Sequence, residues 1–360
     1  MTKRIYNLSP GPAILPEEVL NEAKENILCY GNSGVGILEM SHRSKEFTTI
    51  IEEAKANLLK LLGAGDDFEV LFLQGGASLQ FYMIPLNLAQ GKVPTYILSG
   101  HWAKMAIQEA KRFGEVKIAA SSEDRNFCYI PQVADSMIDP STPYVHFTSN
   151  NTIFGTEFKT EPASNGVPLV CDASSDMLSR KIDIKRYGMI YGGAQKNLGP
   201  SGVTIAVIRK DWIQKSNANL PLMLSYANHS KNQSLFNTPC TFSIYVTGLV
   251  LKWIIKNGGI EAMQKLNEEK AGILYDFLDS SKFYKPTADK DSRSLMNVTF
   301  RLPTEELEGI CVKEALKSGF NEIKGHRSVG GLRASIYNAF PKQGVKDLVS
   351  FLKDFEKKNS

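Results

Sequence analysis

Short runs of β-branched and other apolar residues alternate with amphipathic stretches between residues 66 and 210. Glycine, proline, serine or asparagine separates each run from the next, a pattern typical of parallel strands alternating with covering helices. The apolar runs predict strands at 69–73, 94–99, 115–120, 143–148, 167–172, 188–192 and 202–208. The helices that accompany them are predicted at 16–28, 45–61, 78–89, 102–113 and 241–257. We therefore expect an α/β fold with a large domain, in which helices cover a mostly parallel seven-stranded sheet.

The pattern changes after Gly258-Gly259. From there the chain predicts a long helix near 260–279, a strand at 295–301, a helix at 304–318, a strand at 332–337 and a last helix at 342–357. This order is typical of a smaller α+β domain. A length of 360 residues also favours two domains. We expect residues 16–259 to form the large domain, and residues 1–15 and 260–360 to form the small one.

Composition narrows the possible partners and locations. Apolar residues make up 42% of the chain and charged residues 22%, as in ordinary globular proteins. The net charge of +4 is small and dispersed, so we expect no nucleic-acid partner. The longest apolar runs are far shorter than the roughly 18 residues of a membrane helix, so we expect no membrane span. The start of the chain lacks the apolar centre of a signal peptide, and five scattered cysteines form no CxxC pair, which together favour a reducing cytoplasm.

Two candidate catalytic residues follow neighbouring strands. Asp172 ends the apolar strand 167–172, and Lys196 follows strand 188–192 through a glycine-rich turn. On its own Asp172 could equally be a turn or helix-cap residue. A lysine among small residues at the mouth of a sheet is poorly solvated, which lowers its pKa and frees a neutral amine to condense with a carbonyl group. A pyridoxal phosphate enzyme needs such a lysine, together with an aspartate that keeps the pyridine nitrogen protonated.

Other residues after strands could complete such a site. Gln74-Gly75-Gly76-Ala77-Ser78 opens a helix whose first N–H groups could bind a phosphate, although many strand-to-helix turns look similar. Trp102 could stack on a flat ring or be an ordinary core residue. Thr152 could donate to a ring oxygen or be a turn hydroxyl. The chain has neither the GxGxxG turn of a dinucleotide site nor a GxxxxGK[ST] motif.

Basic residues predict the kind of substrate. His42-Arg43, His326-Arg327 and Arg333 follow small or apolar residues in three separate segments. A single arginine would most simply be a surface ion pair, but three cationic segments favour loops that hold a doubly anionic small molecule. The five histidines lack zinc-ligand spacing, so we expect no metal site, and no GxSxG elbow points to an esterase.

Longer segments resemble the phosphoserine aminotransferases, which are class V, fold-type-I enzymes that depend on pyridoxal phosphate. The resemblance covers essentially the whole chain. It is carried by Asn7-Leu8-Ser9-Pro10-Gly11-Pro12, Met40-Ser41-His42-Arg43-Ser44-Lys45-Glu46-Phe47, Ser99-Gly100-His101-Trp102-Ala103, Gly193-Ala194-Gln195-Lys196-Asn197-Leu198-Gly199-Pro200, Phe236-Asn237-Thr238-Pro239, and the segment 324–339 around His326, Arg327 and Arg333. The lysine motif marks the wider class, and the two His-Arg segments mark the phosphoserine branch.

The resemblance implies a role for each matching residue. Lys196 carries the cofactor and Asp172 pairs with its ring nitrogen. Trp102 stacks on the ring, and Thr152 bonds its oxygen. The cofactor phosphate is held by Gln195, Ala77 and Ser78, and by Asn237 and Thr238 from the other subunit of a homodimer. Arg333 holds the substrate α-carboxylate, while His42 and Arg43, with His326 and Arg327 from the partner, hold the distal phosphate or carboxylate.

The activity implied is reversible amino transfer between L-glutamate and 3-phosphooxypyruvate, giving O-phospho-L-serine and 2-oxoglutarate in serine biosynthesis. The phosphorylated threonine analogue of vitamin B6 synthesis is a further possible substrate. Alternatives are alanine–glyoxylate transamination, cysteine desulfuration, a non-catalytic binding protein of the same fold, and a nucleotide-dependent dehydrogenase. Two positions depart from the resemblance. Ser78 stands where many relatives have an arginine, which predicts weaker phosphoserine binding, and Cys240 replaces a proline, which predicts a looser crossing loop.

Overall fold

The computed structural model describes residues 4–360. Its largest sheet has seven strands in the order β2-β10-β9-β8-β5-β3-β4. The strands are β2 (Phe68–Leu73), β3 (Thr95–Leu98), β4 (Lys117–Ser121), β5 (Val145–Thr148), β8 (Leu169–Asp172), β9 (Tyr187–Gly193) and β10 (Thr204–Arg209). β10 runs antiparallel to both of its neighbours, and the pairs from β9 across to β4 are parallel. The expected mostly parallel seven-stranded sheet is thereby confirmed, and each predicted strand lies within three residues of an observed one.

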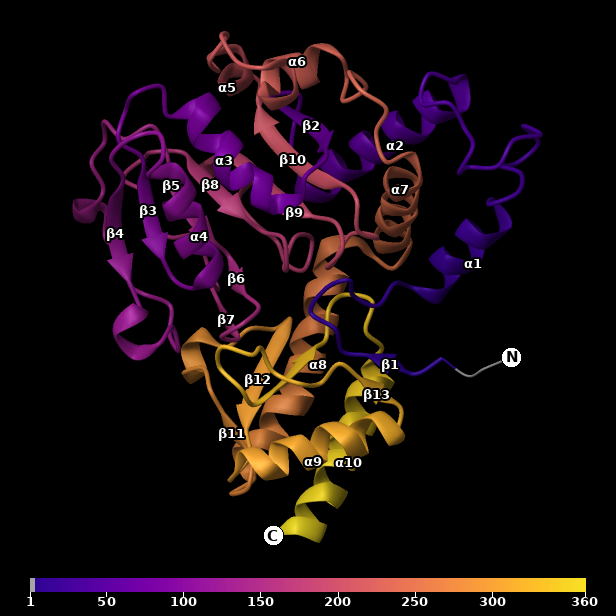
Figure 1. Ribbon diagram of the computed structural model, residues 1–360, viewed down its shortest axis with the longest axis vertical. Helices are drawn as coiled ribbons and strands as arrows, with labels where there is room; N and C mark the ends of the chain where they lie inside the picture. The colour runs from indigo at the N-terminus through magenta and orange to yellow at the C-terminus, as the bar shows by residue number, and fades with distance from the viewer. Residues whose placement is uncertain (1–3) are drawn as a thin grey trace.

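Helices cover both faces of this sheet (Figure 1). Alternate residues of a strand point to opposite faces, so Val70 and Phe72 of β2 pack in one core and Leu71 and Leu73 in the other. The first core contains α2 (Lys45–Leu62) and α7 (Thr241–Lys256). The second contains α3 (Gly76–Leu88) and α4 (His101–Ala110). Because both faces are covered, the central strands are buried along their whole length.

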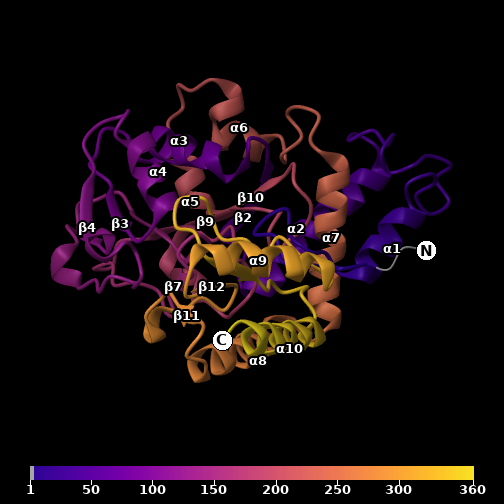
Figure 2. The same ribbon diagram turned by 60° about the horizontal axis from the view of Figure 1, so that its bottom comes forward.

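A third core belongs to the C-terminal part of the chain. Here β11 (Lys285–Pro286), β12 (Asn297–Arg301) and β14 (Leu332–Ser335) form an antiparallel sheet. The helices α8 (Gly259–Ser280), α9 (Glu305–Lys317) and α10 (Lys342–Asn359) accompany it, as Figure 2 shows from below. The N-terminal strand β1 (Tyr6–Asn7) pairs with β13 (Phe320–Asn321), so the start of the chain lies beside this C-terminal part.

α8 joins the two parts of the molecule. Met263 near its start packs in a core of the large sheet, whereas Leu274 and Leu278 pack in the C-terminal core. The helix predicted at 16–28 is α1 (Glu17–Glu25), which ends three residues earlier than expected. The remaining elements are short and had no clear apolar pattern in the sequence. They are β6 (Asn150–Asn151), β7 (Thr156–Glu157), α5 (Lys210–Gln214), α6 (Tyr226–Lys231) and 3-10 helices at 123–125, 135–137, 184–186, 222–224 and 290–292. Among residues 4–360, none of the helices combines the length and the apolar composition needed to cross a bilayer.

Candidate active site

A cavity of about 270 Å³ lies at the carboxyl ends of β5, β8 and β9, where ligands of open α/β sheets bind. It brings together nine of the residues expected from the sequence, from both parts of the molecule. These are Ala77, Ser78, Trp102, Thr152, Asp172, Gln195, Lys196, His326 and Arg333. The wall also contains Pro10, Gly11, Gly76, Phe81, Thr148, Asn150, Ile153, Ser174 and Ser175.

Asp172 is buried at the end of β8. Its Oδ1 accepts the backbone N–H of Ser174 at 3.0 Å and the Ser174 hydroxyl at 2.6 Å. Burial raises the pKa of this carboxyl, while the hydrogen bond from Ser174 and the charge of Lys196 act in the opposite direction. Asp172 therefore does form the Asx-type turn that was the non-catalytic alternative for this residue. The same hydrogen bonds fix its carboxylate in the cavity wall.

Lys196 follows the end of β9 and lines the same cavity. Part of its side chain is exposed to the cavity, but its ammonium lies among protein atoms. This burial lowers the pKa of Lys196 to about 8, and the positive charge of Arg333 lowers it further, whereas Asp172 raises it. A substantial share of the amine is therefore neutral near pH 8, and a neutral amine is the form that attacks a carbonyl. Gly11 lies close by, because a Cβ there would be 3.3 Å from Lys196 Cγ.

Trp102 forms a flat wall beside this lysine. It lies in the first turn of α4, and its indole N–H donates to Thr152 Oγ1 at 3.2 Å. Lys196 Nζ lies 5.6 Å from the centre of the Trp102 ring. A planar ligand stacked on the indole would thus be within reach of the amine and of the Thr152 hydroxyl.

The start of α3 is shaped to receive an anion. Gly75 and Gly76 have φ values of +88° and +68°, which an L side chain rarely adopts. No side chain caps the first turn of α3, whose N–H groups have no partner within the helix. Ala77 and Ser78 of this turn line the cavity. An anionic group at this edge would accept hydrogen bonds from the backbone N–H groups and would be stabilised by the helix dipole.

Two buried polar atoms show that the cavity suits a polar ligand. Arg333, on β14, donates from Nη1 to the Thr152 carbonyl at 2.9 Å. Its Nε is buried and has no partner among the described residues, and neither does Thr148 Oγ1. A buried polar atom without a partner is costly, so a ligand oxygen in the cavity would stabilise both. The cavity therefore favours a ligand with oxygen acceptors, such as a carboxylate.

His326 lies in the cavity of its own chain, whereas the sequence resemblance implied that it comes from a partner subunit. Its ring centre is 6.5 Å from that of His101. Burial, with the nearby charge of Arg333, lowers the pKa of His326. His326 Nδ1 and Ser328 Oγ share a hydrogen bond of 2.7 Å, which holds the ring in the loop that precedes β14.

Five expected residues do not line this cavity: His42, Arg43, Asn237, Thr238 and Arg327. His42 is buried, and this burial, followed by the positive charge of Arg43, lowers its pKa. Arg43 and Arg327 are both exposed. The Asn237 amide donates to Gln74 Oε1 at 2.9 Å, and the Gln74 amide donates to the Thr238 carbonyl at 3.2 Å. This pair therefore lies beside the glycine turn that begins α3, outside the cavity wall.

Sequence reasoning missed several wall residues, notably Thr148, Asn150 and Ser174. The spacing of Ser174, two residues after Asp172, is a usable signal because it is the spacing of an Asx turn. Asn150 donates to Ser175 Oγ and to Asn297 Oδ1, both at 2.8 Å. The contact with Asn297 joins residues 147 positions apart, which no local pattern predicts.

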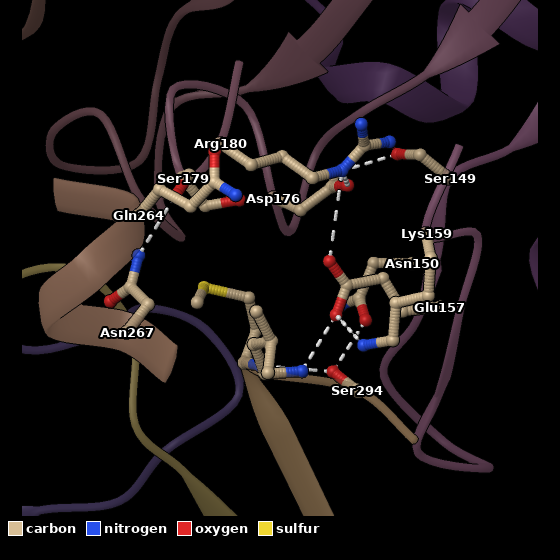
Figure 3. A network of polar contacts seen from close by, with 12 residues as sticks. Ser149, Asn150, Glu157, Lys159, Asp176, Ser179, Arg180, Gln264, Asn267 and Ser294 are labelled. Atoms are coloured by element: carbon tan, nitrogen blue, oxygen red, sulfur yellow. Dashed lines mark hydrogen bonds and ion pairs between the residues drawn. The ribbon is translucent and has the colours of Figure 1, made fainter. Parts of the chain in front are cut away.

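A buried polar network lies behind these wall residues (Figure 3). Arg180 lies between Asp176 and Glu157, with Nε 4.0 Å and 3.8 Å from their carboxylates, and Ser149 donates to Asp176. Burial raises the pKa of Asp176 to about 7, against the pull of Arg180. Glu157 accepts the backbone N–H of Leu295 at 2.6 Å, so the network also holds the segment before β12. Among residues 4–360, no group of three or more histidine, cysteine, aspartate or glutamate side chains is arranged to hold a metal ion.

Comparison with known proteins identifies this arrangement. The family model for class-V aminotransferases matches residues 5–348. Phosphoserine aminotransferases from Desulfosudis oleivorans and Chromobacterium violaceum are each 53% identical, over 100% and 98% of both chains. The crystal structure of the Bacillus circulans subsp. alkalophilus phosphoserine aminotransferase matches with a TM-score of 0.96 at 47% identity, covering 100% of both chains. That of the pyridoxal-phosphate-bound enzyme from Trichomonas vaginalis matches with a TM-score of 0.92 at 36% identity, covering 97% of this chain and 100% of the other. The chain therefore belongs to the class-V aminotransferase family, within its phosphoserine aminotransferases, which use pyridoxal phosphate.

Proposed function

We propose that the chain catalyses reversible amino transfer between L-glutamate and 3-phosphooxypyruvate, giving O-phospho-L-serine and 2-oxoglutarate in serine biosynthesis. The observation that carries this proposal is the convergence of Lys196, Asp172 and Arg333 on one cavity. They supply an amine of lowered pKa, a buried carboxylate and a buried guanidinium with a free N–H. A binding protein without chemistry would not need the first two.

Pyridoxal phosphate, when bound, supplies a carbonyl carbon for the amino group and a protonated ring that withdraws electrons. Asp172 would hold the proton on the ring nitrogen, and Trp102 would support the face of the ring. Thr152, which accepts a hydrogen bond from the Trp102 N–H, would donate to the ring oxygen. The start of α3, with Ala77 and Ser78, and Gln195 would hold the phosphate.

Lys196 has two tasks in this proposal. Its neutral amine would hold the cofactor through the carbonyl carbon, and the same amine, when free, would accept the proton from the substrate Cα. The lowered pKa serves both tasks, because a protonated lysine could neither attack a carbonyl nor accept a proton. Arg333 would bind the α-carboxylate of the amino acid and so orient the substrate. The guanidinium is itself held in place, because its Nη1 donates to the Thr152 carbonyl.

The distal anion of the substrate would be held by His326 together with His42, Arg43 and Arg327. Arg43 and Arg327 are exposed and do not line the cavity of their own chain. We propose that the chain is a homodimer in which a second copy completes this site and brings Asn237 and Thr238 to the cofactor phosphate. Support comes from exposed apolar side chains in the segment before His42, where Leu28 is 87% and Leu38 is 56% exposed. We place the enzyme in the cytoplasm, where its five cysteines, which form no disulfide, would stay reduced.

The proposal is tested by supplying the purified protein and pyridoxal phosphate with O-phospho-L-serine and 2-oxoglutarate, and measuring L-glutamate. Parallel reactions replace the donor by the phosphorylated threonine analogue, or the pair by L-alanine and glyoxylate. We expect the phosphorylated donors to be consumed with far higher kcat/KM than alanine. Faster turnover of alanine and glyoxylate would contradict the phosphoserine assignment while leaving the transaminase assignment intact.

A further inference from the structure

Lys270, in the middle of α8, is a fully buried lysine whose partners are backbone carbonyls. Its side chain is 0% exposed. Nζ donates to the carbonyls of Tyr337 at 2.6 Å, Ile336 at 2.9 Å and Phe340 at 3.2 Å, and a fourth contact, to Asn338, is 3.5 Å long. An ammonium has three N–H donors, so these carbonyls satisfy it completely.

No carboxylate of residues 4–360 forms an ion pair with Lys270. Burial lowers its pKa, whereas donation to three backbone carbonyls favours the protonated form. Burying a charge without an opposite charge is costly, and an apolar side chain would fill the same space at lower cost. An apolar side chain would, however, leave this cluster of carbonyls without its donor. The role of Lys270 is thus better explained by the backbone carbonyls that it binds than by the space that its side chain fills.

The segment that Lys270 holds, residues 336–340, connects the two sides of the active site. It follows directly on β14, which carries Arg333. The Tyr337 hydroxyl donates to the carbonyl of Pro10 at 2.7 Å, in the cavity wall. The backbone N–H of Asn338 donates to Asn197 Oδ1 at 3.0 Å, and Asn197 is the residue next to Lys196. One turn therefore joins the strand of the carboxylate-binding arginine to the segment of the catalytic lysine.

α8 holds this turn at a second point. Asn267 lies one helical turn before Lys270 and is also 0% exposed. Its amide donates to Asn338 Oδ1 at 2.8 Å and to the Ser179 carbonyl at 3.1 Å, the latter contact lying in the region of Figure 3. The Asn338 amide donates in turn to the Leu178 carbonyl at 3.0 Å. The side chain of Asn338 is thus fixed by Asn267, and the backbone of the turn by Lys270.

We propose that Lys270 is a positioning residue, whose buried ammonium fixes the 336–340 turn and thereby the placement of Lys196 relative to Arg333. It lines no part of the cavity, so it acts through the turn and not on the substrate. The proposal rests on the proposed transaminase function. A displacement of about 1 Å in catalytic geometry costs up to roughly 100-fold in rate.

The test compares Lys270→Met with Lys265→Met in the loaded enzyme. Lys265 is an exposed lysine on the same helix and outside the active site, so its substitution controls for loss of a lysine from α8. For Lys270→Met we expect kcat/KM for the glutamate half-reaction, per folded molecule, to fall roughly 10- to 100-fold. We also expect amide hydrogen exchange to accelerate in peptides covering 336–340 and 195–198. Lys265→Met should change neither measurement.

A merely structural role would lower the melting temperature of Lys270→Met but leave kcat/KM per folded molecule within about twofold of the wild type, and that result would overturn the proposal. If Lys270→Met does not fold, Lys270→Gln, which keeps two N–H donors, replaces it with the same expectations. If neither variant folds, the lysine is a folding determinant and the proposal is likewise overturned. A wild type without transaminase activity would instead overturn the proposed function, and the exchange data alone would then decide whether Lys270 holds the two segments.

Discussion

Lys196 Nζ lies 5.6 Å from the centre of the Trp102 ring, with Trp102 itself anchored by its N–H on Thr152. The amine, the flat ring and the hydroxyl come from three separate segments, after β9, at the start of α4 and after β6. All three line the same cavity, so a planar carbonyl compound stacked on the indole would lie within reach of the amine.

The first prediction concerns the pH dependence of cofactor attachment. Only the neutral form of Lys196 attacks a carbonyl, and burial lowers its pKa to about 8. The rate at which the cofactor-free protein binds pyridoxal phosphate covalently should therefore rise about tenfold per pH unit below 8 and level off above it. Stopped-flow absorption measures this rate. A rate that still rises between pH 9 and 10 would show that Lys196 keeps the ordinary pKa of a lysine.

The second prediction concerns Asp172→Asn. In the proposed site the buried carboxylate would stabilise a proton on the ring nitrogen, which an amide of the same shape cannot do. We expect the cofactor to remain attached while removal of the substrate α-proton slows by orders of magnitude in single-turnover experiments. Asp183→Asn, which alters the N-cap of the 3-10 helix at 184–186, serves as the control and should leave this rate unchanged. Equal rates in wild type and Asp172→Asn would show that another group holds the proton.

The third prediction concerns Arg333→Lys. Lysine keeps the positive charge but loses the planar fork, one arm of which is fixed on the Thr152 carbonyl. Because every amino-acid substrate carries the α-carboxylate, KM should rise by a similar factor for glutamate and phosphoserine. A lost charge-assisted hydrogen bond corresponds to about 1.5–3 kcal/mol, or roughly ten- to a hundredfold. An increase for only one of the two substrates would place Arg333 at the distal anion instead.

The fourth prediction concerns the distal anion. A phosphate dianion carries more charge than the γ-carboxylate of glutamate and depends more on the cations around it. Arg327→Ala should therefore weaken phosphoserine more than glutamate. Ser78→Arg, which adds a cation to the cavity wall, should strengthen phosphoserine binding with less effect on glutamate binding. Steady-state KM and kcat/KM values for both substrates test this prediction. If Arg327→Ala lowers kcat/KM equally for both substrates, Arg327 does not belong to the distal anion site.

The sequence predicted those parts of the fold and site that local patterns encode. Strand ends placed Asp172 and Lys196 at one rim of the sheet, because parallel strands bring their carboxyl ends together. The domain boundaries proposed at 15/16 and 259/260 stay a prediction. Sequence could not place His326 in the cavity of its own chain, since that depends on how the loop before β14 folds against α4.

Contacts between distant segments were also beyond local patterns. Nothing around Lys270 distinguishes it from Lys265, the exposed lysine of the same helix, because its carbonyl partners lie 66 or more positions away. The same is true of Asn150, whose partners Asn297 and Ser294 belong to the C-terminal part. Such residues are recognisable only once the two parts of the molecule are packed together.

The central claim, that Lys196 is the lysine that carries the cofactor, is tested most directly by reduction and peptide mapping. The purified protein is loaded with pyridoxal phosphate, treated with borohydride and digested, and the modified peptide is found by mass spectrometry. We expect the added mass on Lys196 alone, and in Lys196→Ala we expect cofactor that is bound but lost on unfolding, with no transamination. A modified lysine elsewhere in the wild type, or a reduced adduct that persists in active Lys196→Ala, would contradict the account.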